Sequence, residues 1–376
     1  MRTLVISDLH LGRRGGAEVL TLPTALGVLQ ERLADVDRLV LLGDTLELRH
    51  GPTRDALGVA EPVLRAIGDA LGPGREVVIV PGNHDHAIAA GWLDWRGRRQ
   101  APDPLALDER VPAARASWIG KRLASFLAPA DVHVAYPGLW LSEDVYAMHG
   151  HYADAHLLVP TLERLAAGVM TRMVGAIPDP ATPDDYESVL APIYALSQAS
   201  AQRGAPGRVA IGSRTAVAAW RALSGRGRSS RVRSRALAVP FRLGVAAANR
   251  AGIGPVEARV SVEDLRRGGL AAAIEAARRL RLAPAHLVFG HTHRTGRLAQ
   301  DPTAEWRTPG GTQLHNAGNW IFDPVFMGRG PQGASPYWPG GAIVVDDGRP
   351  PRLERLLGDV PASLLRDECR EAEVRV

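Results

Sequence analysis

The sequence contains very little cysteine and lysine and has no long apolar run. Cys369 is the only cysteine among 376 residues, which excludes an intramolecular disulfide and favours a reducing compartment. No uninterrupted apolar stretch approaches the roughly 18 residues that a membrane-spanning helix needs. Met1 and Arg2 lead directly into a strand-like run, so we expect no signal peptide. These absences predict a cytoplasmic protein that does not cross a membrane.

Acidic residues are missing from one long segment. Residues 188–256 contain 11 arginines and no Asp or Glu, whereas the rest of the chain carries 34 basic and 40 acidic residues. The formal net charge of +5 is therefore a local excess and not a property of the whole chain. A concentrated positive segment favours an anionic partner at that place.

Apolar runs alternate with helical patterns in the first part of the chain, which predicts a layered α/β core. We expect the turn Tyr136-Pro137-Gly138 to join two separate strands, and we expect 86–130 to be irregular. The runs expected as strands are 3–7, 38–42, 76–80, 132–135, 139–141, 145–148, 286–289, 312–316, 342–345 and 353–356.

The middle of the chain has a different pattern. Residues 156–284 read as helical, because apolar residues recur every three or four positions, as in Leu162, Leu165, Val169 and Met173. The predicted organisation is a core made of 1–155 and 285–358, a helical, arginine-rich insertion at 156–284, and a charged tail at 359–376.

Five short polar motifs occur in order along the chain, most of them directly after an apolar run. They are Asp8-Leu9-His10, Gly43-Asp44, Gly82-Asn83-His84-Asp85, His149-Gly150-His151 and Gly290-His291-Thr292-His293. Strand ends are where α/β proteins build their sites. Carboxylate, amide and imidazole groups that converge there indicate a metal centre. Each motif alone could equally be a polar strand end, a turn or a structural histidine.

Individual residue types suggest individual roles. A carboxylate such as Asp44 has two oxygens and can bridge two cations. Glu47 is more easily explained as a residue that supports a ligand than as a ligand. Asp85 follows His84 directly, so it could orient the imidazole or raise its basicity.

Taken together, the motifs resemble those of the calcineurin-like metallophosphoesterase superfamily over about 1–155 and 285–358. The resemblance implies a four-layer α-β-β-α sandwich with two divalent metal ions. Asp8, His10, Asp44 and His293 would hold the first ion, and Asp44, Asn83, His149 and His291 the second. His84 would be the catalytic histidine, paired with Asp85, and Asn319 would lie near the site. Oxygen and imidazole ligands without thiolate favour Mn²⁺, with Fe or Zn²⁺ as alternatives.

The resemblance implies hydrolysis of a phosphodiester, pyrophosphate or phosphomonoester bond. Ser7-Asp8-Leu9-His10-Leu11 together with Gly43-Asp44-x-x-Glu47 is most similar to the UDP-2,3-diacylglucosamine pyrophosphatase branch, which suggests an amphiphilic, lipid- or nucleotide-linked substrate. That branch has arginine where His84 stands, and its helical lid is shorter than 156–284.

The arginine-rich insertion has three possible explanations. As a lid it would dock on an anionic membrane surface, making the protein peripheral at the inner membrane face, with His151, Arg231 and Arg233 as candidate substrate contacts. As a nuclease element it would bind a phosphate backbone, although the scarcity of aromatic residues beside the arginines disfavours this. It could also be a solvated basic face. A non-catalytic metal-binding scaffold is the remaining alternative for the whole protein.

Overall fold

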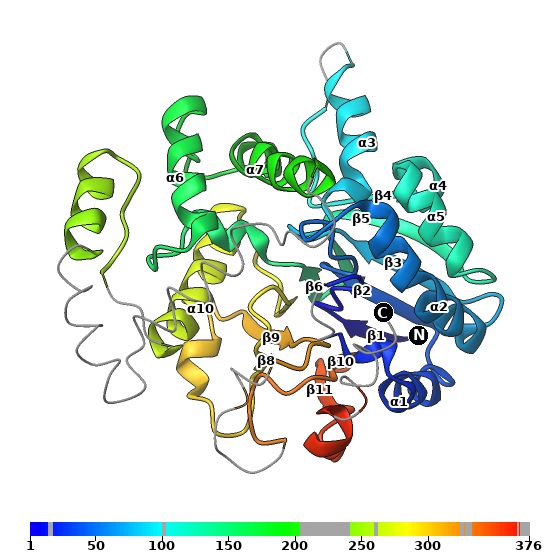
Figure 1. Cartoon of the computed structure of the whole chain (residues 1–376). Helices are drawn as coiled ribbons and strands as arrows, with labels where there is room; N and C mark the ends of the chain where they lie inside the picture. The colour runs from blue at the N-terminus through cyan, green and yellow to red at the C-terminus, as the bar shows by residue number, and fades with distance from the viewer. Residues whose placement is uncertain are drawn as a thin grey trace. The chain divides into compact units, whose positions relative to one another are not determined.

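The computed structural model describes residues 1–13, 18–99, 103–203, 241–258, 262–323, 327, 333–366 and 368 (Figure 1). The chain divides into two compact units. The first comprises residues 1–150, 201–203 and 284–376, and the second comprises 151–200 and 204–283. Arg231 and Arg233 lie outside the described residues.

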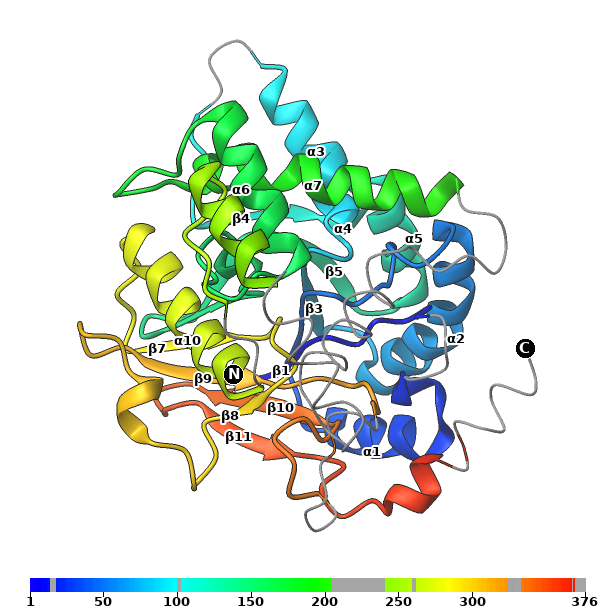
Figure 2. The ribbon, with the colours of Figure 1, turned by 60° about the vertical axis from the view of Figure 1, so that its left-hand side comes forward.

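The first unit is built on a parallel set of short strands. β1 (Arg2–Ile6), β2 (Arg38–Leu42), β3 (Glu76–Val80) and β5 (Asp131–Ser142) lie side by side in that order, all parallel. β10 (Gly341–Asp346) and β11 (Arg352–Arg355) extend this sheet antiparallel beyond β1 (Figure 2). The strands expected at 38–42 and 76–80 are confirmed at the predicted residues.

β5 corrects the prediction of a turn at Tyr136-Pro137-Gly138. The chain runs through these residues as one strand of 12 residues. Its first half pairs with β3 and, through Pro137, with β4 (Asp108–Pro112). From Gly138 onward it pairs with β6 (Val145–Met148). The proline and glycine therefore mark the place where one strand passes from one set of partners to another, which short-range turn statistics do not reveal.

A second set of strands continues from β5. β6 pairs in parallel with β7 (His286–Phe289), and β7 pairs in parallel with β9 (Gln313–Ala317). The short β8 (Thr295–Gly296) closes this edge antiparallel to β9. The predicted α/β class with strands in both halves of the chain is confirmed.

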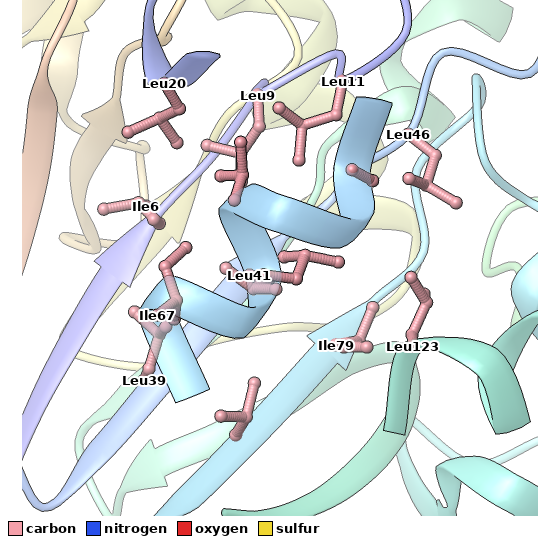
Figure 3. Close-up of a cluster of buried hydrophobic side chains, with 14 of the residues drawn as sticks. Ile6, Leu9, Leu11, Leu20, Leu39, Leu41, Leu46, Ile67, Ile79 and Leu123 are labelled. Carbon is pink, nitrogen blue, oxygen red and sulfur yellow. The ribbon is translucent and has the colours of Figure 1, made fainter. Parts of the chain in front are cut away.

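Alternate side chains of the first strands enter two different apolar clusters. Ile6, Leu41 and Ile79 point to the side covered by α1 (Pro23–Leu33), α2 (Thr53–Leu71) and α5 (Trp118–Phe126), where they pack with residues such as Ile67 and Leu123 (Figure 3). The period of two along a strand sends the intervening residues to the opposite face. There, residues from both sets of strands pack together, including Val5, Val40, Val78, Leu139, Ala147 and Val288.

The stretch 86–130, expected to be irregular, contains regular structure. It holds α3 (Ala87–Gly97), β4, α4 (Ala113–Ala116) and α5. The expectation failed because these elements are short and several prolines and glycines lie among them. Ser117 caps α5 by accepting a hydrogen bond from the Gly120 amide at 3.0 Å.

The described part of the second unit is helical, as the sequence predicts. It contains the 3₁₀ segment η2 (His151–Ala155) and the helices α6 (Leu162–Val174), α7 (Pro183–Arg203, whose last turn belongs to the first unit) and α10 (Val262–Arg279). Residues 241–250 form a further helix. No helix among the described residues combines the length and apolar character that crossing a bilayer requires.

Candidate metal centre

The predicted ligands follow the carboxyl ends of five strands of the first unit. Asp8 and His10 come after β1, Asp44 after β2, and Asn83 after β3. His149 follows β6, and His291 and His293 follow β7. Because parallel neighbours end at the same edge of a sheet, side chains far apart in sequence meet there.

The first cluster contains Asp8, His10 and His293, whose nitrogen and oxygen donor atoms all lie within 4.8 Å of one another. His293 Nε2 lies 3.2 Å from Asp8 Oδ1 and 3.1 Å from His10 Nε2. His10 Nε2 is also 3.6 Å from Asp44 Oδ2. The donor atoms therefore surround one position, and Asp44 borders it.

The second cluster contains Asp44, His149 and His291, again with donor atoms within 4.8 Å. His149 Nε2 lies 3.4 Å from Asp44 Oδ2, the same oxygen that faces the first cluster. The amide oxygen of Asn83 occupies a position 3.2 Å from Asp44 Oδ2 and 3.3 Å from His291 Nδ1. With its amide oxygen and nitrogen exchanged, Asn83 would donate to these two groups and accept from Arg49 Nη1 at 3.1 Å, so in either orientation one amide atom reaches the second cluster.

In two histidines of the centre, a hydrogen bond engages Nδ1, so Nε2 is the nitrogen available to a metal ion. Nδ1 of His149 lies 2.9 Å from the carbonyl oxygen of Leu42, and Nδ1 of His10 lies 3.1 Å from Glu47 Oε2. Each contact holds a proton on Nδ1, so Nε2 is the ring nitrogen that faces the cluster. Such supporting hydrogen bonds are typical of histidines that ligate metals.

Backbone strain is concentrated at the same residues. Asp8, His10, Asp44, His291 and His293 all have φ between 46° and 65°. Among the described residues that are not glycine, only Arg281 shares a positive φ. Each such residue costs of the order of 1–3 kcal/mol, and such strain persists at functional sites where the surrounding structure enforces it.

Two glycines allow the strand ends to approach this closely. A Cβ on Gly43 would lie 2.0 Å from Nδ1 of His149, and Gly43 has a φ of +86°. A Cβ on Gly290 would lie 1.9 Å from the Ser7 hydroxyl. Neither position has room for a larger residue, so both glycines are required by the geometry of the centre.

His84 lies at this centre but is not paired with Asp85, which corrects the prediction. Nδ1 of His84 is 2.9 Å from both carboxylate oxygens of Glu47. The Asp85 carboxylate instead accepts hydrogen bonds from the amides of Gly82, Thr45 and Leu46. Adjacent residues point in different directions, so Asp85 holds the loops after β2 and β3 together while Glu47 orients the histidine.

Glu47 is the functional residue whose role the sequence left least defined. It is fully buried, and its carboxylate contacts both His10 and His84. Its spacing of three residues from Asp44 was the available signal, but that spacing does not indicate which histidines the carboxylate reaches. A third histidine, His50, lies with Nδ1 3.7 Å from Glu47 Oε2.

The carboxylates and imidazoles of the centre shift one another's pKa strongly. Burial lowers the pKa of His10, but contacts with Asp8 and Glu47 outweigh it and raise the pKa to about 10. Burial likewise lowers the pKa of His149, whereas Asp44 raises it, with a net pKa of about 9. Burial raises the pKa of Asp44, but the charges of His149 and His84 hold it well below its usual value.

The remaining candidates occupy other positions. Asn319 is buried, and its amide donates to the His293 carbonyl at 2.6 Å while its oxygen accepts from the Ile321 amide at 2.8 Å. Its side chain supports the His293 loop, which places Asn319 beside the centre as expected, and its contact with substrate stays a prediction. His151 is buried in the second unit, edge-on to Tyr152 and Tyr194. Its proposed contact with substrate stays a prediction.

Fold and site together define a mixed α/β protein with candidate metal-binding clusters of histidine and aspartate at its strand ends. Residues 1–174 match the family model described as calcineurin-like phosphoesterase. This match, over a little under half of the chain, confirms for residues 1–174 the resemblance read from the motifs.

Curated relatives match a shorter part of the chain. UDP-2,3-diacylglucosamine hydrolases from Xanthomonas campestris pv. campestris strains B100 and 8004 are each 32% identical over 108 residues. That stretch is 29% of this chain and 42% of each relative, so the chain spans less than half the length of these relatives.

Proposed function

We propose that this protein is a metal-dependent phosphoesterase that hydrolyses a phosphodiester, pyrophosphate or phosphomonoester bond. The observation that carries the proposal is the pair of donor clusters that share Asp44 Oδ2. The strained backbone at five of the ligands supports it, because a purely structural cluster needs no such distortion.

The donor set fits two divalent cations, with Mn²⁺ favoured over Fe and Zn²⁺ because oxygen and imidazole donors are combined without thiolate. Asp8, His10 and His293 would hold one ion, His149, His291 and Asn83 the other, and Asp44 both. When bound, two such cations supply Lewis-acid activation of water near neutral pH and neutralise the charge of the phosphoryl group.

His84 is the side chain best placed to handle a proton. Its Nδ1 is engaged by Glu47, and its Nε2 lies 4.0 Å from Asp44 Oδ2 at the edge of the shared position. The side chain is 22% exposed, so a substrate oxygen can reach it. Protonated, His84 stabilises developing negative charge or donates a proton to the leaving oxygen, while Glu47 keeps the ring in place.

The proposed substrate is amphiphilic, a lipid- or nucleotide-linked phosphate ester. The names of the Xanthomonas relatives support this class, since a diacylated nucleotide sugar combines a pyrophosphate with acyl chains. His84 stands where the UDP-2,3-diacylglucosamine pyrophosphatase branch has arginine. The side chain proposed to contact the substrate phosphate therefore differs from that branch. The proposed location is the cytoplasm, peripheral at the inner membrane face.

A nuclease is the second candidate function, favoured only by the arginine excess of 188–256. Both readings predict that replacing Arg226, Arg228, Arg231, Arg233 and Arg235 with Gln leaves hydrolysis of a small soluble ester intact. The lipid reading predicts reduced binding to anionic liposomes, at ~1 kcal/mol per arginine. Tight binding to single-stranded DNA with indifference to liposomes at the same salt would favour the nuclease.

The deciding experiment is a substrate screen with Mn²⁺ over nucleotide-linked lipids, phospholipid head groups, cyclic nucleotides and single-stranded DNA. Elemental analysis of the same protein should find two ions per chain. Turnover of bis-p-nitrophenyl phosphate separates an enzyme from a non-catalytic metal-binding scaffold. One ion or none, together with no turnover, would refute the proposal.

A further inference from the structure

Arg294, the residue directly after the proposed ligand His293, has an unusually buried guanidinium group. Its side chain is 6% exposed, and that of its ion-pair partner Asp301 is 7% exposed. Arg294 Nη2 donates to Asp301 Oδ1 at 2.5 Å, and the guanidinium carbon lies 5.0 Å from the ring centroid of Trp306. Replacing a buried ion pair by apolar side chains of similar size is often neutral or stabilising, so stability alone does not explain this pair.

The ion pair closes the segment that follows His293 into a loop. Asp301 Oδ2 accepts a hydrogen bond from the Leu298 amide at 2.8 Å, while Oδ1 of the same carboxylate accepts from Arg294. One carboxylate therefore holds both the beginning and the middle of this loop. The position of Arg294 is fixed as a consequence.

Trp306 connects the loop to the neighbouring strand β9. A Cβ on Gly296 would lie 2.1 Å from Cη2 of Trp306 and 3.0 Å from Nη1 of Arg294, so these three residues are packed in direct contact. The Trp306 carbonyl accepts a hydrogen bond from Gln313 Nε2 at 2.9 Å, and Gln313 is the first residue of β9. Because β9 pairs with β7, the strand that leads to His293, Arg294 is anchored to the sheet that carries the ligand.

His293 needs such an anchor more than His10 and His149 do. The rings of His10 and His149 are each oriented by a hydrogen bond at Nδ1. Within the described part of the chain, no hydrogen bond engages Nδ1 of His293, and its side chain is 33% exposed against 3% for His10. The backbone of His293 has a φ of 57°, which the surrounding structure must enforce. The direction of this ring therefore depends on how its backbone is held.

Two contacts hold the backbone at this point. The His293 carbonyl accepts a hydrogen bond from the Asn319 amide group at 2.6 Å, and the next residue, Arg294, is held by its ion pair. His291 is held separately, because its backbone amide donates to Asp8 Oδ2 at 3.0 Å. Loss of the Arg294 anchor should therefore move His293 and leave His291 in place.

We propose that Arg294 is a positioning residue for the first cluster. Through its ion pair with Asp301 and its contact with Trp306 it aims Nε2 of His293 at the position that Asp8 and His10 also face. The inference rests on the proposed function for the presence of the ions, and it assigns the affinity of one of the two positions to one ion pair. Residues that orient metal ligands typically change metal affinity by about 10–100-fold when they are replaced.

The test is a calorimetric titration of the full chain with Mn²⁺. The variant combines Arg294→Met with Asp301→Leu, because removing both charges avoids leaving one of them buried without its partner. The control combines Arg96→Met with Glu109→Leu, an ion pair of 2.6 Å between α3 and β4 of the same unit. We expect the affinity of one position to fall by about 10–100-fold in the variant. The other position, and both positions in the control, should change by less than about twofold.

A second measurement separates positioning from a general effect on the fold. On a His293→Ala background, the substitution of Arg294 and Asp301 should change Mn²⁺ affinity by less than about twofold, because the ring through which Arg294 acts is absent. On a His291→Ala background, which spares the first cluster, the loss of about 10–100-fold should remain.

Equal weakening of both positions would overturn the inference, as would an undiminished loss on the His293→Ala background. A folded double variant with both affinities unchanged would overturn it too. Two-step Mn²⁺ binding by a wild type that hydrolyses no bis-p-nitrophenyl phosphate would refute the proposed function, while the selective loss of one affinity would still support the inference.

Discussion

The sheet of the first unit and helix α6 of the second unit place apolar and polar side chains in opposite ways. In the first unit, Ile6, Leu41 and Ile79 are buried between sheet and helices, and the buried polar groups gather at the strand ends. In α6 of the second unit, Arg164 is buried while Leu162 and Met173 face solvent. The first arrangement concentrates charge where a reaction can use it. The second arrangement places apolar side chains where a partner can reach them. Each unit therefore departs locally from the usual burial of apolar residues and exposure of polar ones.

The largest effect on the metal centre of the first unit is expected from weakening the shared carboxylate of Asp44. Asp44→Asn removes the charge that both clusters approach, so we expect it to lower metal content at both positions and to reduce turnover by at least about 10³-fold. Elemental analysis and bis-p-nitrophenyl phosphate hydrolysis measure the two effects. Liposome binding by the second unit should not change. An Asn variant that retains two ions and activity would mean that Asp44 is not shared.

Removing His84 should separate proton handling from metal binding. His84→Ala is expected to keep both ions and to lose at least ~10²-fold in turnover, as for a general acid. Parallel measurement of metal content and rate checks this. Near-normal turnover would transfer the role to another group, with His151 the first to examine.

Glu47→Gln sharpens the distinction between orientation and reaction. The amide keeps the size of the side chain but cannot accept hydrogen bonds from both His10 and His84 as the carboxylate does. We therefore expect turnover to fall by about 10–100-fold. Asp85→Asn serves as a comparison, because Asp85 accepts only backbone amides. If the Asp85 variant lost more turnover while keeping its fold, the pairing of His84 with Glu47 would be wrong.

The pKa shifts predict that metal binding releases protons. His10 and His149 have pKa values raised to about 10 and about 9 in the metal-free protein, so both are charged at neutral pH. Each must lose a proton to coordinate, so affinity should rise with pH up to that range, with about two protons released per chain at pH 7. Calorimetry in two buffers of different ionisation enthalpy counts them. Binding without proton release would show that these imidazoles are already neutral.

Much of the first unit could be predicted from the sequence, because its strands are short runs of buried residues and its ligands directly follow them. β2, β3, β6 and β7 lie at the predicted residues. The predicted turn at Tyr136-Pro137-Gly138 was wrong, because a strand's change of pairing partners is set by tertiary structure and is not visible in the local sequence. The role of Glu47 was not predictable in detail, since its distance from His84 depends on how two loops meet. For α6, periodicity gave the helix but not which face is buried, because burial of Arg164 depends on carbonyl groups elsewhere in the unit.

The continuous strand β5 has a consequence for how the centre comes into being. β1, β2 and β3 pair on one side of its path, and β6 and β7 follow on the other. Each donor cluster takes members from both sides: Asp8 and His10 with His293, and Asp44 with His149 and His291. No fragment of the chain that ends before β7 contains a complete set of donors. Ion uptake during synthesis or refolding should therefore be a late event, which makes a bound metal a marker of finished topology.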